Sequence, residues 1–204
     1  MKTGFCELVG YNPRDHYFKK AKKENFAARS IYKLEEIDQR YRVIKRGGIV
    51  LDLGCSPGSW SQYASQKVGE TGRVLGVDLQ PVTVSLPNAV FIQADLYDLN
   101  LEETFQQHGF TPPFDAVISD MAPKTTGIKF TDQTRSTQLC ELAIATADRF
   151  LKKGGHFVCK FFHSGDFGLM KKELNRRYKR VEVVKPDATR EISKEIFFVG
   201  LEKL

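Results

Sequence analysis

The 204-residue sequence predicts a single α/β domain: a mostly parallel seven-stranded sheet with an antiparallel last strand and helices on both faces. Short apolar runs alternate with longer amphipathic stretches, which is typical of successive strand–helix–strand units. The last two apolar runs are separated by little more than a turn, and so short a connection favours antiparallel pairing. Because 41% of the residues are hydrophobic, the chain can build one substantial core.

The elements follow in order along the chain. The apolar runs predict strands at Ile49–Leu53, Val74–Val77, Val90–Ile92, Phe114–Ile118, Phe157–Phe162, Val181–Val184 and Glu195–Leu201. The amphipathic stretches predict helices at Trp60–Val68, Leu101–His108, Thr134–Leu151 and Phe167–Tyr178. Ser59 is the expected N-cap of the first of these helices. Polar loops at Pro123–Gln133 and His163–Asp166 leave the carboxyl ends of strands, where open α/β sheets bind ligands.

The N-terminal segment is basic and precedes the predicted sheet. Residues 1–46 contain 12 Lys/Arg against 6 Asp/Glu, whereas residues 47–204 contain 19 of each. We therefore divide the chain into a basic segment, 1–46, and a core domain, 47–204. Ile31, Leu34 and Ile37 recur at helical spacing, so this segment is expected to contain a helix that docks on the sheet. Such a helix can present Lys33 on another face.

Clustered positive charge predicts contact with a polyanion, and nucleic acid is the first candidate. The residues expected to contact RNA are Lys19, Lys20, Lys22, Lys23 and Arg29. An ordinary solvated basic tail is the alternative.

Several other classes of protein are not indicated. No apolar stretch approaches the length of a membrane span, and the first residues lack the pattern of a secretory signal. We therefore expect an intracellular protein without membrane contact. The four cysteines form no C-x-x-C pair, and the four histidines do not stand at zinc-ligand spacing beside them, so neither a disulfide framework nor a metal site is expected.

The glycine-bearing turn after the first strand predicts a ligand site. Gly54 and Gly58 let the backbone bend tightly and approach a ligand, although their spacing is not the G-x-G-x-x-G of dinucleotide sites. Asp78 ends the second strand, where a carboxylate can accept hydrogen bonds from ribose hydroxyls. Asp95 follows the third strand and is placed toward the adenine end. Together they predict a ligand that contains a nucleoside.

The same turn formally matches the G-x-S-x-G elbow of α/β-hydrolases, with Ser56 as the nucleophile. Asp120 and His163 even follow in hydrolase order. That elbow uses the backbone N–H of the residue after the serine to stabilise an oxyanion. Here this residue is Pro57, which has no N–H, so a hydrolase is disfavoured.

A single lysine, Lys160, interrupts the apolar run His156–Phe162. Burial penalises the charged form of a lysine, which is how a protein can make a base of this side chain; the alternative is a strand-end lysine whose stem reaches out to water. Asp120 ends the fourth strand and Glu195 opens the antiparallel last strand, so both are expected at the same sheet edge. This convergence favours catalysis over separate surface ion pairs. Asp115, near the start of the fourth strand, is expected to be structural.

These residues carry a recognisable pattern. The chain resembles the RrmJ/FtsJ family of S-adenosylmethionine-dependent RNA 2′-O-methyltransferases over nearly its whole length. The matching segments are Asp15–Tyr17, Arg29–Leu34, Asp52–Gln62, Ser119–Pro123, Val158–Lys160 and Lys185–Pro186, with Glu195 opening the last strand. The resemblance implies a Rossmann-like class I methyltransferase domain.

The resemblance also implies roles for residues. The family's catalytic set falls on Lys33, Asp120, Lys160 and Glu195, with Lys160 as the general base. Its methyl-donor site falls on Gly58, Trp60, Asp78, Asp95 and Asp120, with Gly54, Ser56 and Pro57 in the same turn. The implied cofactor is S-adenosylmethionine, which leaves as S-adenosylhomocysteine, and no metal is required.

The implied substrate is a uridine of large-subunit (23S) ribosomal RNA, presented by an assembled large ribosomal subunit. The protein is expected to be a monomer in a bacterial cytoplasm. One alternative is a 2′-O-methyltransferase that acts on another RNA, such as tRNA or an mRNA cap. Another is a non-catalytic RNA-binding factor of ribosome assembly. Base methylation is disfavoured because Asp120–Pro123 is not the Asn/Asp-Pro-Pro-aromatic motif that such enzymes usually carry.

Overall fold

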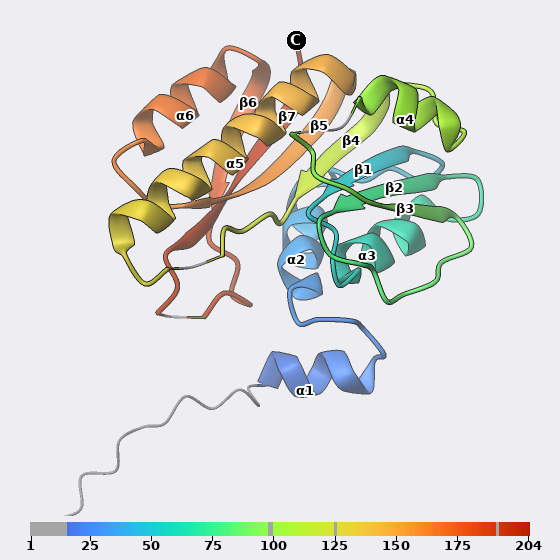
Figure 1. Cartoon of the computed structure of the whole chain (residues 1–204), viewed down its shortest axis with the longest axis horizontal. Coiled ribbons are helices and arrows are strands. Elements are labelled where there is room, and N and C mark those ends of the chain that lie inside the picture. The colour runs from blue at the N-terminus through green and yellow to red at the C-terminus, as the bar shows by residue number, and fades with distance from the viewer. Residues whose placement is uncertain (1–15, 98–99, 125, 191) are drawn as a thin grey trace, which may run out of the picture.

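A computed structural model of the chain describes residues 16–97, 100–124, 126–190 and 192–204, so Asp15 lies outside the described residues. They form a 7-stranded sheet with strand order β3-β2-β1-β4-β5-β7-β6 (Figure 1). The strands are β1 Ile49–Leu53, β2 Arg73–Asp78, β3 Ala89–Gln93, β4 Phe114–Ser119, β5 Leu151–Phe162, β6 Tyr178–Val184 and β7 Glu195–Lys203. β7 runs antiparallel to β5 and β6, whereas β1 to β5 pair in parallel. The predicted sheet is confirmed.

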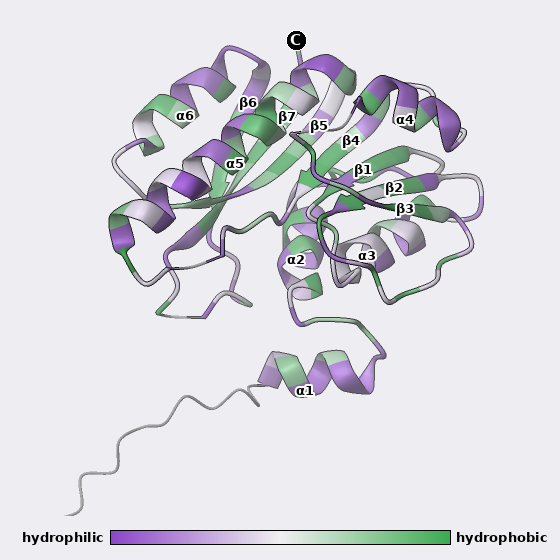
Figure 2. Ribbon diagram, viewed as in Figure 1, coloured by the Kyte–Doolittle hydropathy of each residue, from purple (hydrophilic) through white to green (hydrophobic). Residues whose placement is uncertain are grey.

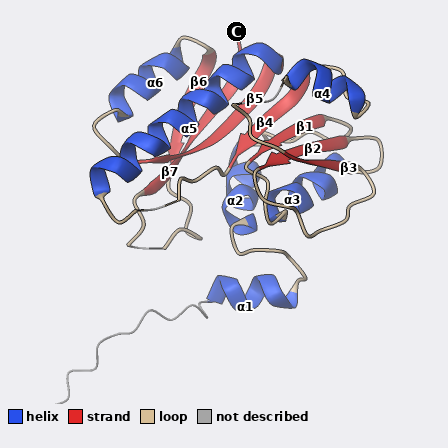
Figure 3. Ribbon diagram, in the orientation of Figure 1, coloured by secondary structure: helices blue, strands red, loops and turns tan. Residues whose placement is uncertain are grey.

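Helices cover both faces of this sheet (Figure 3). They are α1 His16–Lys23, α2 Ile31–Tyr41, α3 Ser59–Val68, α4 Leu101–Gln107, α5 Lys129–Phe150 and α6 Phe167–Asn175. α2 and α3 pack on one face, with α1 beyond α2, and α4, α5 and α6 pack on the other (Figure 1). None of these described helices combines the length and the apolar character that crossing a membrane would require.

The strands divide their side chains between two apolar layers, and the middle of the sheet is strongly hydrophobic (Figure 2). In β1, Val50 belongs to the layer with α2 and α3, while Leu51 and Leu53 belong to the layer with α4, α5 and α6. A strand buried on both faces reads as a continuous apolar run. A charged residue within such a strand therefore needs a specific partner.

The predicted docking helix is present as α2. Ile31, Leu34 and Ile37 are each at most 1% exposed and pack in the same layer as Val50 of β1. This part of the basic segment thus shares its core with the sheet. The division of the chain at residue 46 stays a prediction.

Two predicted helix starts are wrong. The N-cap of α3 is Gly58, whose φ of 116° lies in the left-handed region, and Ser59 is the first helical residue. Its hydroxyl forms a 2.8 Å hydrogen bond with the Ser30 hydroxyl instead of capping the helix. α5 begins at Lys129, five residues before the predicted start. The Asp132 carboxylate accepts hydrogen bonds from the N–H groups of residues 126 and 127, which fixes a turn that polar sequence alone did not reveal.

Candidate active site

Lys160 lies inside the sheet beside Asp120. Its Nζ donates hydrogen bonds to Asp120 Oδ1 at 2.9 Å and to the Asp120 backbone oxygen at 2.5 Å. Ser119 of β4 pairs with Cys159 of β5, so the residues that follow them, Asp120 and Lys160, lie side by side at the carboxyl edge of the sheet. The Lys160 side chain is 8% exposed, so it does not reach out to water.

A second ion pair joins Lys33 of α2 to Glu195, the first residue of β7. Both side chains are largely buried, at 12% and 13% exposure. Lys33 Nζ also lies 5.8 Å from the centroid of the Phe197 ring, and Phe197 is the β7 residue paired with Lys160. The structure therefore brings all four predicted catalytic residues to one sheet edge, as two ion pairs.

A pocket of about 310 Å³ opens at the carboxyl ends of β1, β2 and β4. The predicted donor-site residues that line it are Gly54, Ser56, Asp78, Asp95 and Asp120. Asp120 also holds Lys160, so a single carboxylate connects the pocket with the buried lysine. The remaining lining is mainly apolar and was missed by sequence reasoning; it includes Leu79, Tyr97, Met121, Leu139 and Leu142. Met121 lies in the matching segment Ser119–Pro123, whereas no sequence signal separated the other four from ordinary core or surface residues.

The turn after β1 is held in place by Asp78. Asp78 Oδ2 accepts a hydrogen bond from the Ser56 N–H at 2.9 Å, and Oδ1 accepts one from the Gln80 N–H at 2.7 Å. Each carboxylate oxygen can accept a further hydrogen bond, so Asp78 can hold the turn and still bind ribose hydroxyls. Likewise, Asp95 Oδ1 accepts a hydrogen bond from the Tyr97 N–H at 2.9 Å.

Three predicted donor-site residues do not line this pocket: Pro57, Gly58 and Trp60. The Trp60 side chain is 2% exposed, and its Nε1 donates a 2.9 Å hydrogen bond to the Ser30 backbone oxygen. The structure thus shows Trp60 as a packing residue between α3 and the start of α2. Its donor contact stays a prediction.

Replacing Gly54 with alanine is expected to weaken donor binding by more than about tenfold. A Cβ at Gly54 would lie 2.5 Å from Met121 Cγ and 3.0 Å from the Met121 backbone nitrogen, so Met121 would be pushed into the pocket that it lines. The φ of 76° adds roughly 1–2 kcal/mol of strain for any other residue. Calorimetry with S-adenosylhomocysteine measures the change.

Gly154→Ala is the matched control for this prediction. Gly154 has a similar φ of 72°, but an added Cβ would meet nothing within 4 Å. It should therefore show only the loss of stability that the left-handed φ causes, and it should keep its donor affinity. If the two variants bound S-adenosylhomocysteine with equal affinity, Gly54 would be needed only for its backbone conformation and not to keep Met121 out of the pocket.

Asp52 of β1 was missed as a site candidate. It is fully buried, its Oδ2 accepts a 2.6 Å hydrogen bond from the Ser61 hydroxyl, and its Oδ1 has no hydrogen-bond partner among the described residues. Burial raises the pKa of Asp52 to about 7; the Ser61 hydrogen bond opposes this rise, while Asp120 and Asp78 add to it. A signal was present, since Asp52 interrupts an apolar run just as Lys160 does.

The predicted RNA-contact residues fall into two groups. Lys19, Lys22 and Lys23 are exposed on α1, whereas Lys20 Nζ lies 4.2 Å from the centroid of the Tyr32 ring. Arg29 is partly buried and donates a 2.5 Å hydrogen bond to the Ala188 backbone oxygen. Arg29 thus ties the start of α2 to the segment before β7.

A sheet in which only β7 is antiparallel, with a nucleoside-sized pocket at its carboxyl edge, defines the class of Rossmann-like methyltransferases. A model of the FtsJ-like methyltransferase family matches residues 26–203. The chain belongs to this family.

Curated relatives match almost the whole chain. A protein of Bdellovibrio bacteriovorus named ribosomal RNA large subunit methyltransferase E is 71% identical over 193 residues, which is 95% of this chain and 98% of the relative. A protein of the same name from Oleidesulfovibrio alaskensis is 51% identical over 190 residues, covering 92% of this chain and 91% of the relative.

Solved structures show the same fold. A crystal structure from Plasmodium falciparum, described as a ribosomal RNA methyltransferase, has a TM-score of 0.75 at 27% identity and covers 88% of this chain and 99% of its own. Fibrillarin of Aeropyrum pernix, solved with bound S-adenosyl-L-methionine, has a TM-score of 0.58 at 18% identity and covers 78% of this chain and 68% of its own. The likeness to fibrillarin shows the fold alone.

Proposed function

We propose that this protein transfers a methyl group from S-adenosylmethionine to a uridine 2′-hydroxyl of large-subunit (23S) ribosomal RNA. The observation that carries the proposal is the Asp120 carboxylate, which lines the nucleoside-sized pocket and also binds Nζ of the buried Lys160. The names of the relatives support the choice of RNA. The expected setting is the cytoplasm, with a monomer acting on an assembled large subunit and with no metal.

The pocket residues fit the donor. Bound S-adenosylmethionine supplies an already activated methyl group on a sulfonium. Asp78 would accept hydrogen bonds from the ribose hydroxyls of the donor, and Asp95 would bind toward its adenine. Gly54 and the turn through Ser56, Pro57 and Gly58 let the backbone approach the ligand, while Trp60 holds α3 behind that turn.

Lys160 is the general base of the proposed reaction. A 2′-hydroxyl is a weak nucleophile, so its oxygen must lose a proton as it bonds to the methyl carbon, while the bond from that carbon to sulfur breaks and leaves S-adenosylhomocysteine. Lys160 Nζ, in its neutral form, takes that proton. Asp120 fixes the position of Nζ by two hydrogen bonds, and the Lys33–Glu195 pair holds the target ribose at the same edge.

Mapping the methylated nucleotides tests the substrate. Purified protein and labelled S-adenosylmethionine are incubated with large ribosomal subunits, free 23S RNA and tRNA from cells that lack the gene. We expect a ribose methyl group on one uridine of the large subunit, and more transfer to subunits than to free RNA. Methylation of tRNA alone would establish the alternative RNA substrate, and no transfer to any RNA would favour the non-catalytic assembly factor.

Replacing Lys19, Lys20, Lys22 and Lys23 with alanine is expected to weaken RNA binding by at least about tenfold and to reduce the slope of log K against log salt by about 3. Each lysine that contacts a phosphate releases counterions on binding, which produces that slope. Fluorescence anisotropy across a salt series measures both quantities. A Lys67→Ala/Lys153→Ala control removes charge far from α1 and should leave the slope unchanged.

A further inference from the structure

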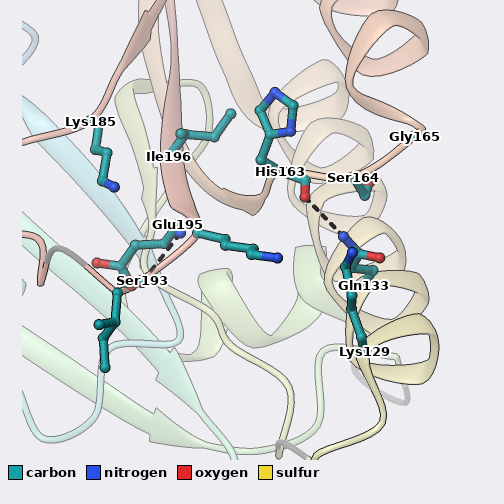
Figure 4. A pocket seen from close by; sticks show the side chains of 11 residues that line it. Lys129, Gln133, His163, Ser164, Gly165, Lys185, Ser193, Glu195 and Ile196 are labelled. Carbon is teal, nitrogen blue, oxygen red and sulfur yellow. Dashed lines mark hydrogen bonds between the residues drawn. The ribbon is translucent and has the colours of Figure 1, made fainter.

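A second pocket, separate from the donor pocket, is lined in part by Glu195 (Figure 4). Its volume is about 790 Å³, within the range of roughly 300–1,000 Å³ that is usual for ligand sites. Three segments form it: the first turn of α5, the connection between β5 and α6, and the residues before β7. Its lining includes Lys129, Gln133, His163, Lys185, Lys194 and Glu195.

The pocket is suited to an anion. Lys129, Lys185 and Lys194 line it, and Glu195 is the acidic residue among the described residues of its lining. The charge of Glu195 is already neutralised by the ion pair with Lys33. The lining therefore carries an excess of positive charge, and Lys129 and Lys194 are both exposed to solvent.

The walls of the pocket are joined to one another. Gln133 Nε2 donates a 2.9 Å hydrogen bond to the His163 backbone oxygen, which links α5 to the end of β5 (Figure 4). The His163 N–H donates a 3.1 Å hydrogen bond to the Lys194 backbone oxygen, which links β5 to the segment before β7. The His163 ring stacks on Phe167, with centroids 5.0 Å apart and an interplanar angle of 18°. An ordered planar ring at an exposed position is a platform on which a base can stack.

We propose that this pocket binds the nucleotide next to the methylated one, with its phosphate on Lys129 and Lys194 and its base on His163. The inference rests on the proposed function. Glu195 lines this pocket and also belongs to the predicted catalytic set, so the pocket adjoins the catalytic residues. If the target ribose lies at Lys160, the neighbouring nucleotide of the same RNA strand therefore lies in the pocket. A third pocket, lined by residues that include Arg29, Lys33 and Glu195, lies toward α2 and would continue the path of the RNA strand.

A double variant and a matched control test the phosphate contact. Lys129→Ala/Lys194→Ala should raise KM for RNA at least about tenfold, with kcat at saturating RNA changed less than about threefold. For binding of a labelled single-stranded RNA oligonucleotide, the slope of log K against log salt should become smaller in magnitude by about 1.4 in this variant. Lys67→Ala/Lys153→Ala removes the same charge at the opposite edge of the sheet and should change neither. A pocket variant that behaves like this control overturns the proposal.

The stacking contact is tested at His163. His163→Ala should weaken binding of the same oligonucleotide by about 5- to 150-fold, and His163→Phe should restore it, because stacking needs a flat ring and not an imidazole. If the alanine and phenylalanine variants bound the oligonucleotide with equal affinity, the proposal that a base stacks on His163 would be refuted. Binding is measured without turnover and is therefore independent of methylation. If the wild-type protein failed to methylate RNA, the proposed function would be refuted, while the binding assay would still decide whether the pocket binds RNA.

Discussion

Lys160→Met is expected to slow methyl transfer by about 10²- to 10⁴-fold, the usual contribution of a general base, while donor binding changes less than about threefold. Methionine keeps most of the stem of the buried side chain and removes only the nitrogen that would accept the proton. Asp120, not Lys160, lines the donor pocket, so the donor keeps its contacts. Single-turnover transfer of tritiated methyl groups at saturating donor measures the rate, and calorimetry with S-adenosylhomocysteine measures binding.

Loss of folding must be separated from loss of the base. Lys160→Met leaves the Asp120 carboxylate, only 17% exposed, without its ammonium, and breaking such a pair costs about 3–5 kcal/mol. Lys160→Met/Asp120→Asn removes both charges and should recover stability in thermal unfolding without recovering activity. Lys153→Met, an exposed position on the same strand, should change nothing. A folded Lys160→Met protein with an undiminished rate would show that another group takes the proton.

The sheet and the meeting of Lys160, Asp120 and Glu195 could be predicted because both follow from strand direction. Parallel strands end at one edge, and an antiparallel strand begins there, so the register alone brings these three residues together. The two ion pairs could not be predicted in the same way. Whether Lys33 pairs with Glu195 or with Asp120 depends on how α2 docks on the sheet, and helical spacing defines the buried face of a helix without defining its position along the strands.

Two side-chain contacts beside the turn after β1 have a common cause. Ser59 was expected from the sequence to cap α3, and the resemblance implies a donor contact for Trp60, which stays a prediction. In the structure the Ser59 hydroxyl and the Trp60 indole nitrogen both bind Ser30. That partner is about 30 residues away in the sequence, and side-chain partners at such separations are decided by tertiary packing. The loops Pro123–Gln133 and His163–Asp166, expected at the ligand edge, both line the pocket beside Glu195. That Lys185 and Lys194 join them there could not be predicted for the same reason, since these lysines come from separate segments.

Asp52→Asn is expected to become progressively more stabilising, relative to the wild-type protein, as the pH rises from 5 to 7. Burial raises the pKa of Asp52 to about 7, far above its ordinary 3.8. Between these values the unfolded chain releases the Asp52 proton while the folded protein keeps it, so the free energy of unfolding falls by about 1.4 kcal/mol per pH unit. The total loss is on the order of 4 kcal/mol and is complete above pH 7. Asparagine does not ionise, so the variant lacks this slope.

Urea unfolding of both proteins from pH 5 to pH 8 measures the difference, and Asp115→Asn is the control. Although burial raises it, the pKa of Asp115 is held below its ordinary value by hydrogen bonds from Lys152 and from the Ile49 N–H. The stability that Asp115 contributes is therefore lost only as the pH falls below about 4, and Asp115→Asn should differ from the wild-type protein by a constant between pH 5 and pH 8. A constant difference for Asp52→Asn as well would mean that Asp52 is already ionised in the folded protein. Asp52 Oδ1 has no hydrogen-bond partner in the described part of the chain, which argues against this, because a buried carboxylate needs partners on both oxygens to remain charged.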